Sequence, residues 1–417
     1  MTDQANSALT STSSSARGVS APPAYWGGVF AMTLCVFALI ASEFMPVSLL
    51  TPMAADLRVT EGMAGWGIAA SGALAVLTSL FISTLARRMN RKTLLLGLTG
   101  IMAVSGAVIA LAPNYLVYMI GRSLIGVVVG GFWSMSAATA MRLVPTDRVP
   151  RALAIFNGGN ALATVVAAPL GAWLGGAIGW RGAFFCLVPV ALAAFLWQWV
   201  SLPSMHIEPR KTGPGHAFKL FRSRVVTLGM LGVGLFFMGQ FTLFTYVRPF
   251  LETVTRVDDS MVTMILLVIG VAGFIGTTMI GMMLRWGLYR ALICIPVLMA
   301  AIAISLAEFG NSSSAVIALL GFWGLVATAA PVGWWIWVPR TFPQDAEAGG
   351  GLMVAVVQFS IALGSTAGGL LFDHSGYQSM LAASAAILLV AAVLIFLTAR
   401  AEMTRAYERC GLQGAAA

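Results

Sequence analysis

The sequence has very few charged residues for its size. Only 9% of its 417 residues are Asp, Glu, Lys or Arg, whereas 59% are hydrophobic. A soluble domain carries about 25% charged residues, so most of this chain cannot face water. This scarcity excludes a soluble enzyme and a disordered protein. We therefore expect a polytopic membrane protein that lies in the lipid bilayer.

Signatures of catalysis and of ATP use are also missing. The sequence contains no G-x-x-x-x-G-K-[ST] loop to hold ATP phosphates and no H-E-x-x-H zinc motif. The three histidines fall in expected loops, so a buried Ser/His pair is not available. We expect no enzyme activity, no cofactor and no metal site. Any uphill work must then draw on an ion gradient.

What the sequence has instead is a series of long apolar runs. A membrane-spanning helix needs about 20 apolar residues, and the ten-residue alternation of a membrane β-barrel is absent. We predict an all-α protein with twelve transmembrane helices. Their expected ranges are 26–50, 63–85, 94–112, 115–141, 152–177, 183–202, 225–250, 260–284, 289–308, 314–339, 349–372 and 377–399.

The 24 basic residues indicate the orientation of these helices. With the N-terminus in the cytoplasm, 19 of the 24 fall in cytoplasmic loops and tails. Only Arg58, Arg181 and Arg256 fall in outside loops, and two more lie in or at the ends of spans. Cytoplasmic loops of membrane proteins are enriched in Lys and Arg. We therefore expect both termini inside, and we interpret the formal charge of +9 as an orientation signal and not as nucleic-acid binding.

Composition divides the chain into two bundles. Residues 1–24 are rich in Ser and Thr without an apolar core, which predicts a disordered cytoplasmic tail and no signal peptide. Residues 204–224 concentrate Pro, Gly and basic residues, as a cytoplasmic linker does. The linker separates six-helix bundles at 25–203 and 225–400, and a second cytoplasmic tail follows at 401–417.

The two bundles repeat each other at an offset of about 198 residues. Five pairs share this offset: Arg58 and Arg256, Ser83 and Gly281, Arg87 and Arg285, Asn160 and Gln358, Gly171 and Gly369. Parallel six-helix halves of this kind form transporters with the substrate site between them. Coincidence between apolar sequences is the competing interpretation.

Two charges stand inside the expected spans. Glu43 is the only carboxylate well within a span, and a charge there costs about 2.5–3.5 kcal/mol. We predict that Glu43 couples protons to transport, although a structural Glu bonded to a neighbouring helix is the alternative. Arg122 is a possible partner for Glu43 in this role. Helix packing, or snorkelling toward the cytoplasm, would equally explain Arg122.

Polar and aromatic residues at mid-span outline a candidate substrate cavity. Flat rings stack on a planar solute, while amides read its hydrogen-bonding edges. For any single aromatic residue, packing against lipid is the competing interpretation. The candidates are Trp133, Ser134, Asn157, Asn160, Gln240, Phe241, Phe244, Tyr246, Trp334, Trp335 and Gln358, with Arg248 either capping the cavity or reaching the interface. Gly171, Gly175 and Gly179, at four-residue spacing, predict close helix packing.

Several motifs resemble those of the major facilitator superfamily. The segment Ser83–Lys92 resembles its G-x-x-x-D-R-x-G-R-[RK] gating loop and keeps Arg88, Arg91 and Lys92. It departs from that pattern at Ser83, Arg87 and Asn90, which puts the usual acidic contact of the loop in doubt. Arg122–Gly126 matches the R-x-x-x-G of the fourth span, which the resemblance associates with proton transfer. Ala168–Gly171 is a degraded form of the antiporter motif.

Longer strings are similar to those of the purine ribonucleoside efflux pumps, which are drug:proton antiporter-type members of this superfamily in bacterial inner membranes. The resemblance implies a monomer that exports inosine- and guanosine-like nucleosides by proton antiport and alternating access. Sugar or multidrug efflux by the same fold is the alternative, and a receptor or scaffold without transport is a second. The strings are Glu43–Pro52, Gly130–Ser136, Met141–Pro145, Gly179–Arg181, Pro331–Trp334 and Val354–Gln358.

Overall fold

The computed structural model describes residues 24–85, 89–205, 223–342 and 346–414. Every regular element in these residues is a helix, and ten helices are long and apolar enough to cross a membrane. The elements are α1 (Trp26–Leu57), α2 (Glu61–Leu85), α3 (Arg91–Ala110), α4 (Tyr115–Arg142), η2 (Thr146–Arg148), α5 (Val149–Ser201), α7 (Arg224–Phe244), α8 (Val247–Phe250), η4 (Leu251–Thr255), α9 (Asp259–Arg285), α10 (Leu288–Phe309), α11 (Ser313–Ala327), α12 (Ala330–Thr341) and α13 (Ala346–Gly414).

Two of the ten long helices each contain two spans. Gly179 interrupts α5 with φ 76° and ψ 163°, and Gly376 interrupts α13 with φ 81° and ψ 172°. Glycine alone adopts such a conformation without strain, so the chain turns sharply at these two residues. Counting each double helix as two gives the twelve spans that the apolar runs predict. The all-α fold class is therefore confirmed.

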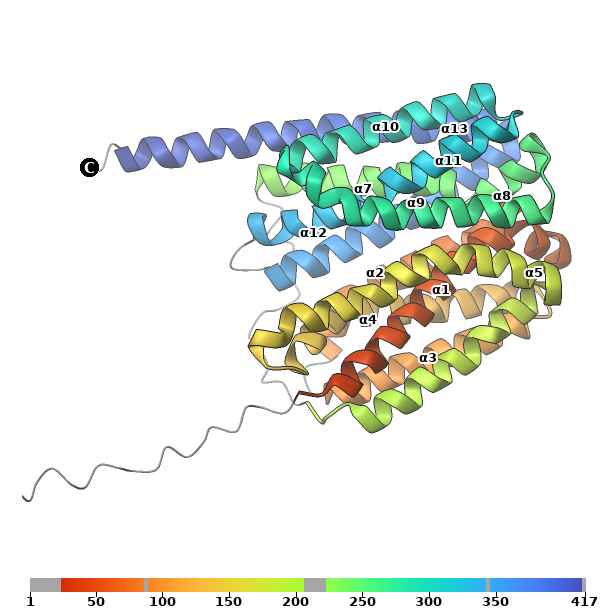
Figure 1. Ribbon diagram of the computed structural model, residues 1–417, viewed down its shortest axis with the longest axis horizontal. Coiled ribbons are helices and arrows are strands. Elements are labelled where there is room, and N and C mark those ends of the chain that lie inside the picture. Colours follow the sequence, from red (N-terminus) through yellow and green to blue (C-terminus); the bar gives the residue numbers. More distant parts are fainter. Residues whose placement is uncertain (1–23, 86–88, 206–222, 343–345, 415–417) are drawn as a thin grey trace, which may run out of the picture.

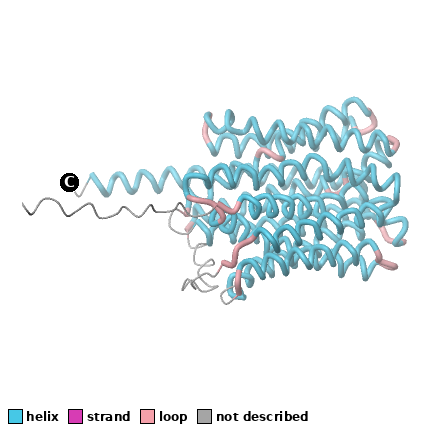
Figure 2. The backbone as a smooth tube through the Cα atoms, turned by 60° about the horizontal axis from the view of Figure 1, so that its bottom comes forward, coloured by secondary structure: helices cyan, strands magenta, loops and turns pink. Residues whose placement is uncertain are grey.

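The helices form two groups that lie side by side. In Figure 1, α1–α5 fill the lower part of the view and α7–α13 the upper part. Within each group, the most extensive helix contacts are those of α1 with α5 and of α7 with α13. Between the two groups, α2 packs on α13 and α5 packs on α9. Figure 2 shows the same long, nearly parallel helices, with the C-terminal part of α13 extending well beyond the bundle.

The two ends of the bundle differ in what they carry. At one end lie Tyr25, the start of α3 and residues 202–205; we call it the linker end. There the backbone N–H of Arg91 donates to Met205 O at 3.0 Å, and that of Tyr25 to Leu143 O at 2.7 Å. The opposite end, which we call the distal end, carries the loops at 58–60, 111–114, 256–258 and 310–312 and the turns at Gly179 and Gly376.

The internal repeat is visible in the backbone at the distal end. Arg58, which ends α1, and Arg256, which ends η4, both adopt the left-handed conformation with φ 56° and ψ 47°. Two residues later, Thr60 Oγ1 accepts a hydrogen bond from Met63 N at 3.1 Å, and Asp258 Oδ1 accepts one from Met261 N at 3.0 Å. Corresponding residues of the two halves therefore end one helix and cap the next in the same way.

Two of the expected spans are interrupted. The predicted span at 225–250 ends as α7 at Phe244 and resumes as the short α8, where Pro249 cannot donate a backbone hydrogen bond to Thr245 O. The predicted span at 314–339 is divided at Thr328 and Ala329, just before Pro331. Near the end of the chain, α13 continues as a helix to Gly414 and does not end with the predicted span at residue 399.

The glycines of the fifth span divide into two roles. A Cβ at Gly171 would lie 2.5 Å from Ser48 Oγ, and one at Gly175 would lie 2.4 Å from Leu49 Cδ2. These two glycines let α5 pack closely on α1, as their spacing predicts. Gly179 has no neighbour within 4 Å of such a Cβ and instead forms the turn between two spans, so its predicted packing role is wrong.

Candidate functional site

A hydrogen bond between Glu43 and Gln358 joins the two halves in the middle of the bundle. Gln358 Nε2 on α13 donates to Glu43 Oε1 on α1 at 3.2 Å. Glu43 is half-buried and Gln358 is 6% exposed. The structure thus brings together one residue predicted for proton coupling and one predicted for substrate binding. A change in the protonation of this carboxylate would change a contact between the halves.

Phe44, the residue after Glu43, packs on an aromatic ring of the other half. The rings of Phe44 on α1 and Phe244 on α7 meet edge to face, with centroids 6.0 Å apart. Phe241 and Phe244 form a second edge-to-face pair, also at 6.0 Å. Gln240 is one helical turn before Phe244, and its buried Oε1 has no hydrogen-bond partner in the described part of the chain. In this conformation Phe241 and Phe244 are 9% and 8% exposed, so these rings and the Gln240 amide are packed within the bundle.

Arg122 binds backbone carbonyls beside Glu43. Its side chain is 1% exposed; Nη1 donates to Ser42 O at 2.9 Å and Nε to Gly67 O at 3.2 Å. Ser42 O is available because Pro46, four residues on, has no N–H to donate to it. The ion pairs of the described residues do not include one between Arg122 and Glu43. Arg122 instead binds the carbonyl of the residue that precedes Glu43.

Two predicted substrate residues, Tyr246 and Arg248, lie where the two halves meet at the distal end. Tyr246 has no exposed surface, donates to Ser365 O at 2.7 Å and stacks on Phe372 with centroids 5.8 Å apart. Arg248 is 6% exposed and donates to Glu252 and to Asp259, each at 2.6 Å. It also donates to Ser48 O of the other half. In this conformation these residues hold helices together and have no free surface for a substrate.

The remaining predicted substrate residues are dispersed. Trp133, Ser134 and Asn160 are half-buried, whereas Asn157 is exposed. Trp334 is 1% exposed and packs edge to face on Trp337, with ring centroids 5.7 Å apart. Its neighbour Trp335 is 49% exposed, because successive residues of a helix point in different directions. No hydrogen bond among the described residues joins these candidates to Glu43 or Gln358; they are Trp133, Ser134, Asn157, Asn160, Trp334 and Trp335.

The predicted gating loop is described only in part, since Arg88 lies outside the described residues. Arg91 and Lys92 begin α3, and the Asn90 side chain caps this helix by accepting from Lys92 N at 2.9 Å. Asn90 Nδ2 also donates to Ser204 Oγ at 2.6 Å. Asn90, where the family motif has glycine, thus joins the loop to the segment that follows α5 within the same half.

Sequence reasoning missed a further contact between the halves. Asp373 of α13 accepts hydrogen bonds from Thr60 Oγ1 at 2.5 Å and from Gly62 N at 3.1 Å. A Cβ at Gly62 would lie 2.2 Å from Asp373 Oδ2 and 2.9 Å from the backbone O of Gly369, so a larger residue there would displace the carboxylate. The carboxylate caps the N-terminus of α2 from the other half. No local pattern could reveal this contact, because it joins residues more than 300 positions apart.

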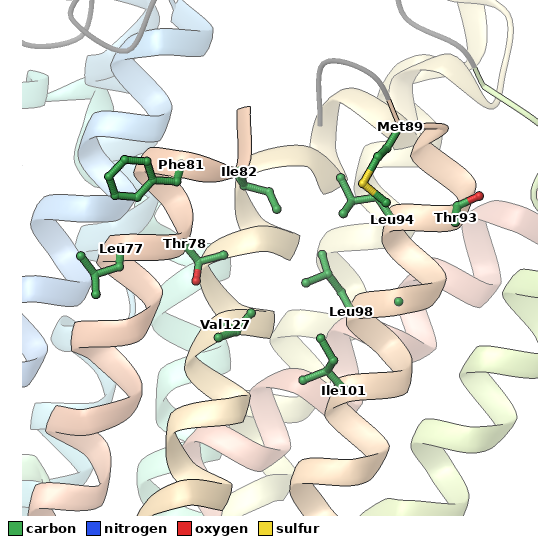
Figure 3. A pocket seen from close by; sticks show the side chains of 11 residues that line it. Leu77, Thr78, Phe81, Ile82, Met89, Thr93, Leu94, Leu98, Ile101 and Val127 are labelled. Atoms are coloured by element: carbon green, nitrogen blue, oxygen red, sulfur yellow. The ribbon is translucent and has the colours of Figure 1, made fainter. Parts of the chain in front are cut away.

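A separate apolar groove lies at the linker end of α2, α3 and α4. Its volume is about 390 Å³, and in Figure 3 Leu77 and Phe81 of α2 face Leu98 and Ile101 of α3 across it. Its lining contains no charged side chain and none of the predicted site residues. This groove faces outward, since Phe81 is 63% exposed, and it lies within one half.

In the described residues no group of three or more His, Cys, Asp or Glu side chains could hold a metal ion.

Comparisons with known proteins relate the chain to membrane transporters. The Major Facilitator Superfamily profile matches residues 32–350. The chain is 66% identical over 380 residues to the transcription regulatory protein OpdE of Pseudomonas aeruginosa, covering 90% of this chain and 94% of that protein. It is 37% identical over 380 residues to the purine ribonucleoside efflux pump NepI of Salmonella typhimurium, covering 91% of this chain and 95% of that protein.

Solved structures show the same fold at low sequence identity. A bacterial homologue of the human lysosomal transporter Spinster, inward-facing and unoccupied, matches with a TM-score of 0.71 and 16% identity, over 92% of this chain and 98% of that one. The nucleoside transporter NupG also matches with a TM-score of 0.71, at 12% identity, over 89% of this chain and 98% of that one.

Proposed function

Because this chain belongs to the Major Facilitator Superfamily, we propose that it is a proton-driven transporter that exports purine ribonucleosides from the cytoplasm. The hydrogen bond between Glu43 and Gln358 carries this proposal, because it places the one mid-span carboxylate against the opposite half. Similarity over most of the chain to a purine ribonucleoside efflux pump supports the substrate class.

In the proposed antiport cycle, Glu43 carries the proton. Ionised Glu43 only accepts hydrogen bonds, whereas protonated Glu43 can also donate one, so each proton transfer changes its contact with Gln358. A proton from outside binds Glu43, the halves rock, and cytoplasmic nucleoside displaces the proton inward. One proton that moves inward across 100 mV supplies about 2.3 kcal/mol, to which the pH gradient adds.

The surrounding residues suit a purine. The rings of Phe44, Phe241 and Phe244 offer faces and edges for a base to pack against. The side-chain amide of Gln358 and the unpartnered Oε1 of Gln240 offer donors and acceptors for its edge. A sugar carrier would need more hydroxyl-reading polar groups, and a drug pump a larger apolar surface.

We place the linker end in the cytoplasm, because that end carries most of the basic residues. In the described residues, the hydrogen bonds between the halves begin at the Glu43 and Gln358 pair and continue toward the distal end. These contacts close the distal end, and in alternating access an exporter receives its substrate from the cytoplasm while its outer end is closed.

The test uses purified protein in proteoliposomes with an acidic interior. Protons that leave the vesicle should drive uptake of radiolabelled inosine to several times the level reached without a pH gradient. Arabinose and a cationic dye serve as the competing substrates. Inosine inertness alongside pH-driven transport of the dye or the sugar would overturn the nucleoside assignment and leave the fold assignment intact.

A second candidate function is regulation of transcription, because a relative with 66% identity carries that name. A transporter can influence transcription indirectly, by setting the cytoplasmic concentration of a small effector. A transport-defective Glu43→Gln variant separates the two roles in cells that lack the native gene. If the variant restores gene expression as well as the wild type does, then regulation does not depend on proton-coupled transport.

A further inference from the structure

Helix α1 contains two prolines, and each leaves one backbone carbonyl without its usual partner. In an α-helix the carbonyl of residue i accepts from the N–H of residue i+4, which proline lacks. Pro46 therefore leaves Ser42 O free, and Pro52 leaves Ser48 O free. A carbonyl without a donor is costly inside a membrane protein, so another group must bind it.

Arginine side chains bind both carbonyls, but from different halves. Arg122 of α4, in the same half as α1, donates to Ser42 O at 2.9 Å. Arg248 of α8, in the other half, donates to Ser48 O. The first contact stabilises the N-terminal half, whereas the second exists only while the two halves are close together at the distal end.

The remaining donors of Arg248 are bound within its own half. Nε donates to Glu252 Oε1 at 2.6 Å, and Nη2 donates to Asp259 Oδ1 at 2.6 Å. Only 7% of the side chain is exposed. The two carboxylates neutralise the charge and fix the direction of the guanidinium, so that Nη1 is held toward α1.

We propose that Pro52, the Ser48 carbonyl and Arg248 form a latch that holds the distal end closed, and that this latch must open before the protein faces outward. Arg248 is then a positioning residue of the transport cycle and not a substrate ligand. Pro52 is part of the latch because an N–H at residue 52 would bond Ser48 O within α1. The inference rests on the proposed alternating access, but not on the identity of the substrate.

The test measures the distance across the distal end by pulsed electron paramagnetic resonance. Spin labels are attached to cysteines at Leu111 and Asn311, which are exposed in distal loops of different halves. The four native cysteines are first replaced. Pro52→Ala restores the N–H in α1 and does not threaten folding. We expect it to raise the ratio of open to closed distal ends about tenfold, without substrate or a pH gradient.

Pro46→Ala is the matched control. It is the same substitution in the same helix, but the carbonyl it affects is bound within one half, so no contact between the halves is removed. It should leave the distance distribution as in the wild type. Arg248→Gln should shift the distribution as Pro52→Ala does, and the double variant should open no further than the single ones, because both remove one interaction. Unchanged distances in Pro52→Ala, or equal opening in Pro46→Ala, would overturn the latch.

The distance measurement also separates the latch from the proposed function. If Pro52→Ala opens the distal end while the wild type fails to transport inosine, the latch stands and the nucleoside assignment falls. If the wild type transports inosine under a pH gradient but Pro52→Ala leaves the distances unchanged, the transport function stands and the latch is wrong.

Discussion

Gln358 donates a hydrogen bond to Glu43 at 3.2 Å, across 315 positions of sequence and between the two halves of the bundle. Glu43 is the one carboxylate well inside an expected span, and Gln358 is the repeat equivalent of Asn160. A group that can gain or lose a proton thus contacts the opposite half directly. Through this contact, binding of a proton at Glu43 can change how the two halves are held together.

The first prediction concerns Glu43→Gln. The amide keeps the shape of the side chain and can still bond Gln358, so we expect normal expression and thermal stability. Because the variant cannot release a proton, pH-driven accumulation of inosine in proteoliposomes should fall to the level seen without a gradient. Uphill accumulation at the wild-type level would exclude Glu43 as the coupling residue.

The second prediction concerns the two carbonyls that Arg122 binds. Lysine keeps the charge but cannot reproduce both directed bonds, to Ser42 O and Gly67 O. A hydrogen bond to a charged group contributes about 1.5–3 kcal/mol, so Arg122→Lys should lower the apparent Tm by several degrees. Arg142→Lys, at the exposed end of the same helix, is the control and should leave the Tm unchanged. Thermal unfolding in detergent decides between them.

The third prediction concerns the crossing of α5 and α9. A Cβ at residue 270 would lie 2.5 Å from Val165 O, a carbonyl whose helical donor is missing because residue 169 is proline. Gly270→Ala should therefore force the halves apart and slow transport about tenfold, since overpacking costs about 1–3 kcal/mol. Gly281→Ala, in the same helix but without a neighbour within 4 Å, should transport normally. Equal rates in the two variants would contradict the close contact.

The fourth prediction compares two aspartates that cap helices. Asp373→Ala removes the cap that the C-terminal half provides to α2, so the distance between labels at Leu111 and Asn311 should increase. Asp258→Ala removes a cap within one half, on Met261 N, and should cost about 1 kcal/mol of stability without changing that distance. An unchanged distance in Asp373→Ala would show that this contact does not hold the distal end closed.

The internal repeat shows how far sequence reasoning reaches. The 198-residue offset paired Arg58 with Arg256, and the structure gives both the same left-handed backbone. Local rules suffice here, because each arginine ends a helix just before a capping residue. The same offset paired Asn160 with Gln358, yet only Gln358 contacts Glu43. The halves share their backbone but differ in the side chains at the interface, and an offset cannot tell which partner makes the contact.

The scarcity of charge determined the membrane environment and the search for a coupling residue, because a charge inside a span is costly. The long apolar runs determined the all-helical class, because a spanning helix needs about 20 apolar residues. The tertiary structure alone decided what those charges bind. Arg122 and Arg248 both donate to carbonyls that prolines of α1 leave free, one within a half and the other between halves. Which helix each arginine reaches depends on how distant segments pack, and periodicity along one helix carries no information about its neighbours.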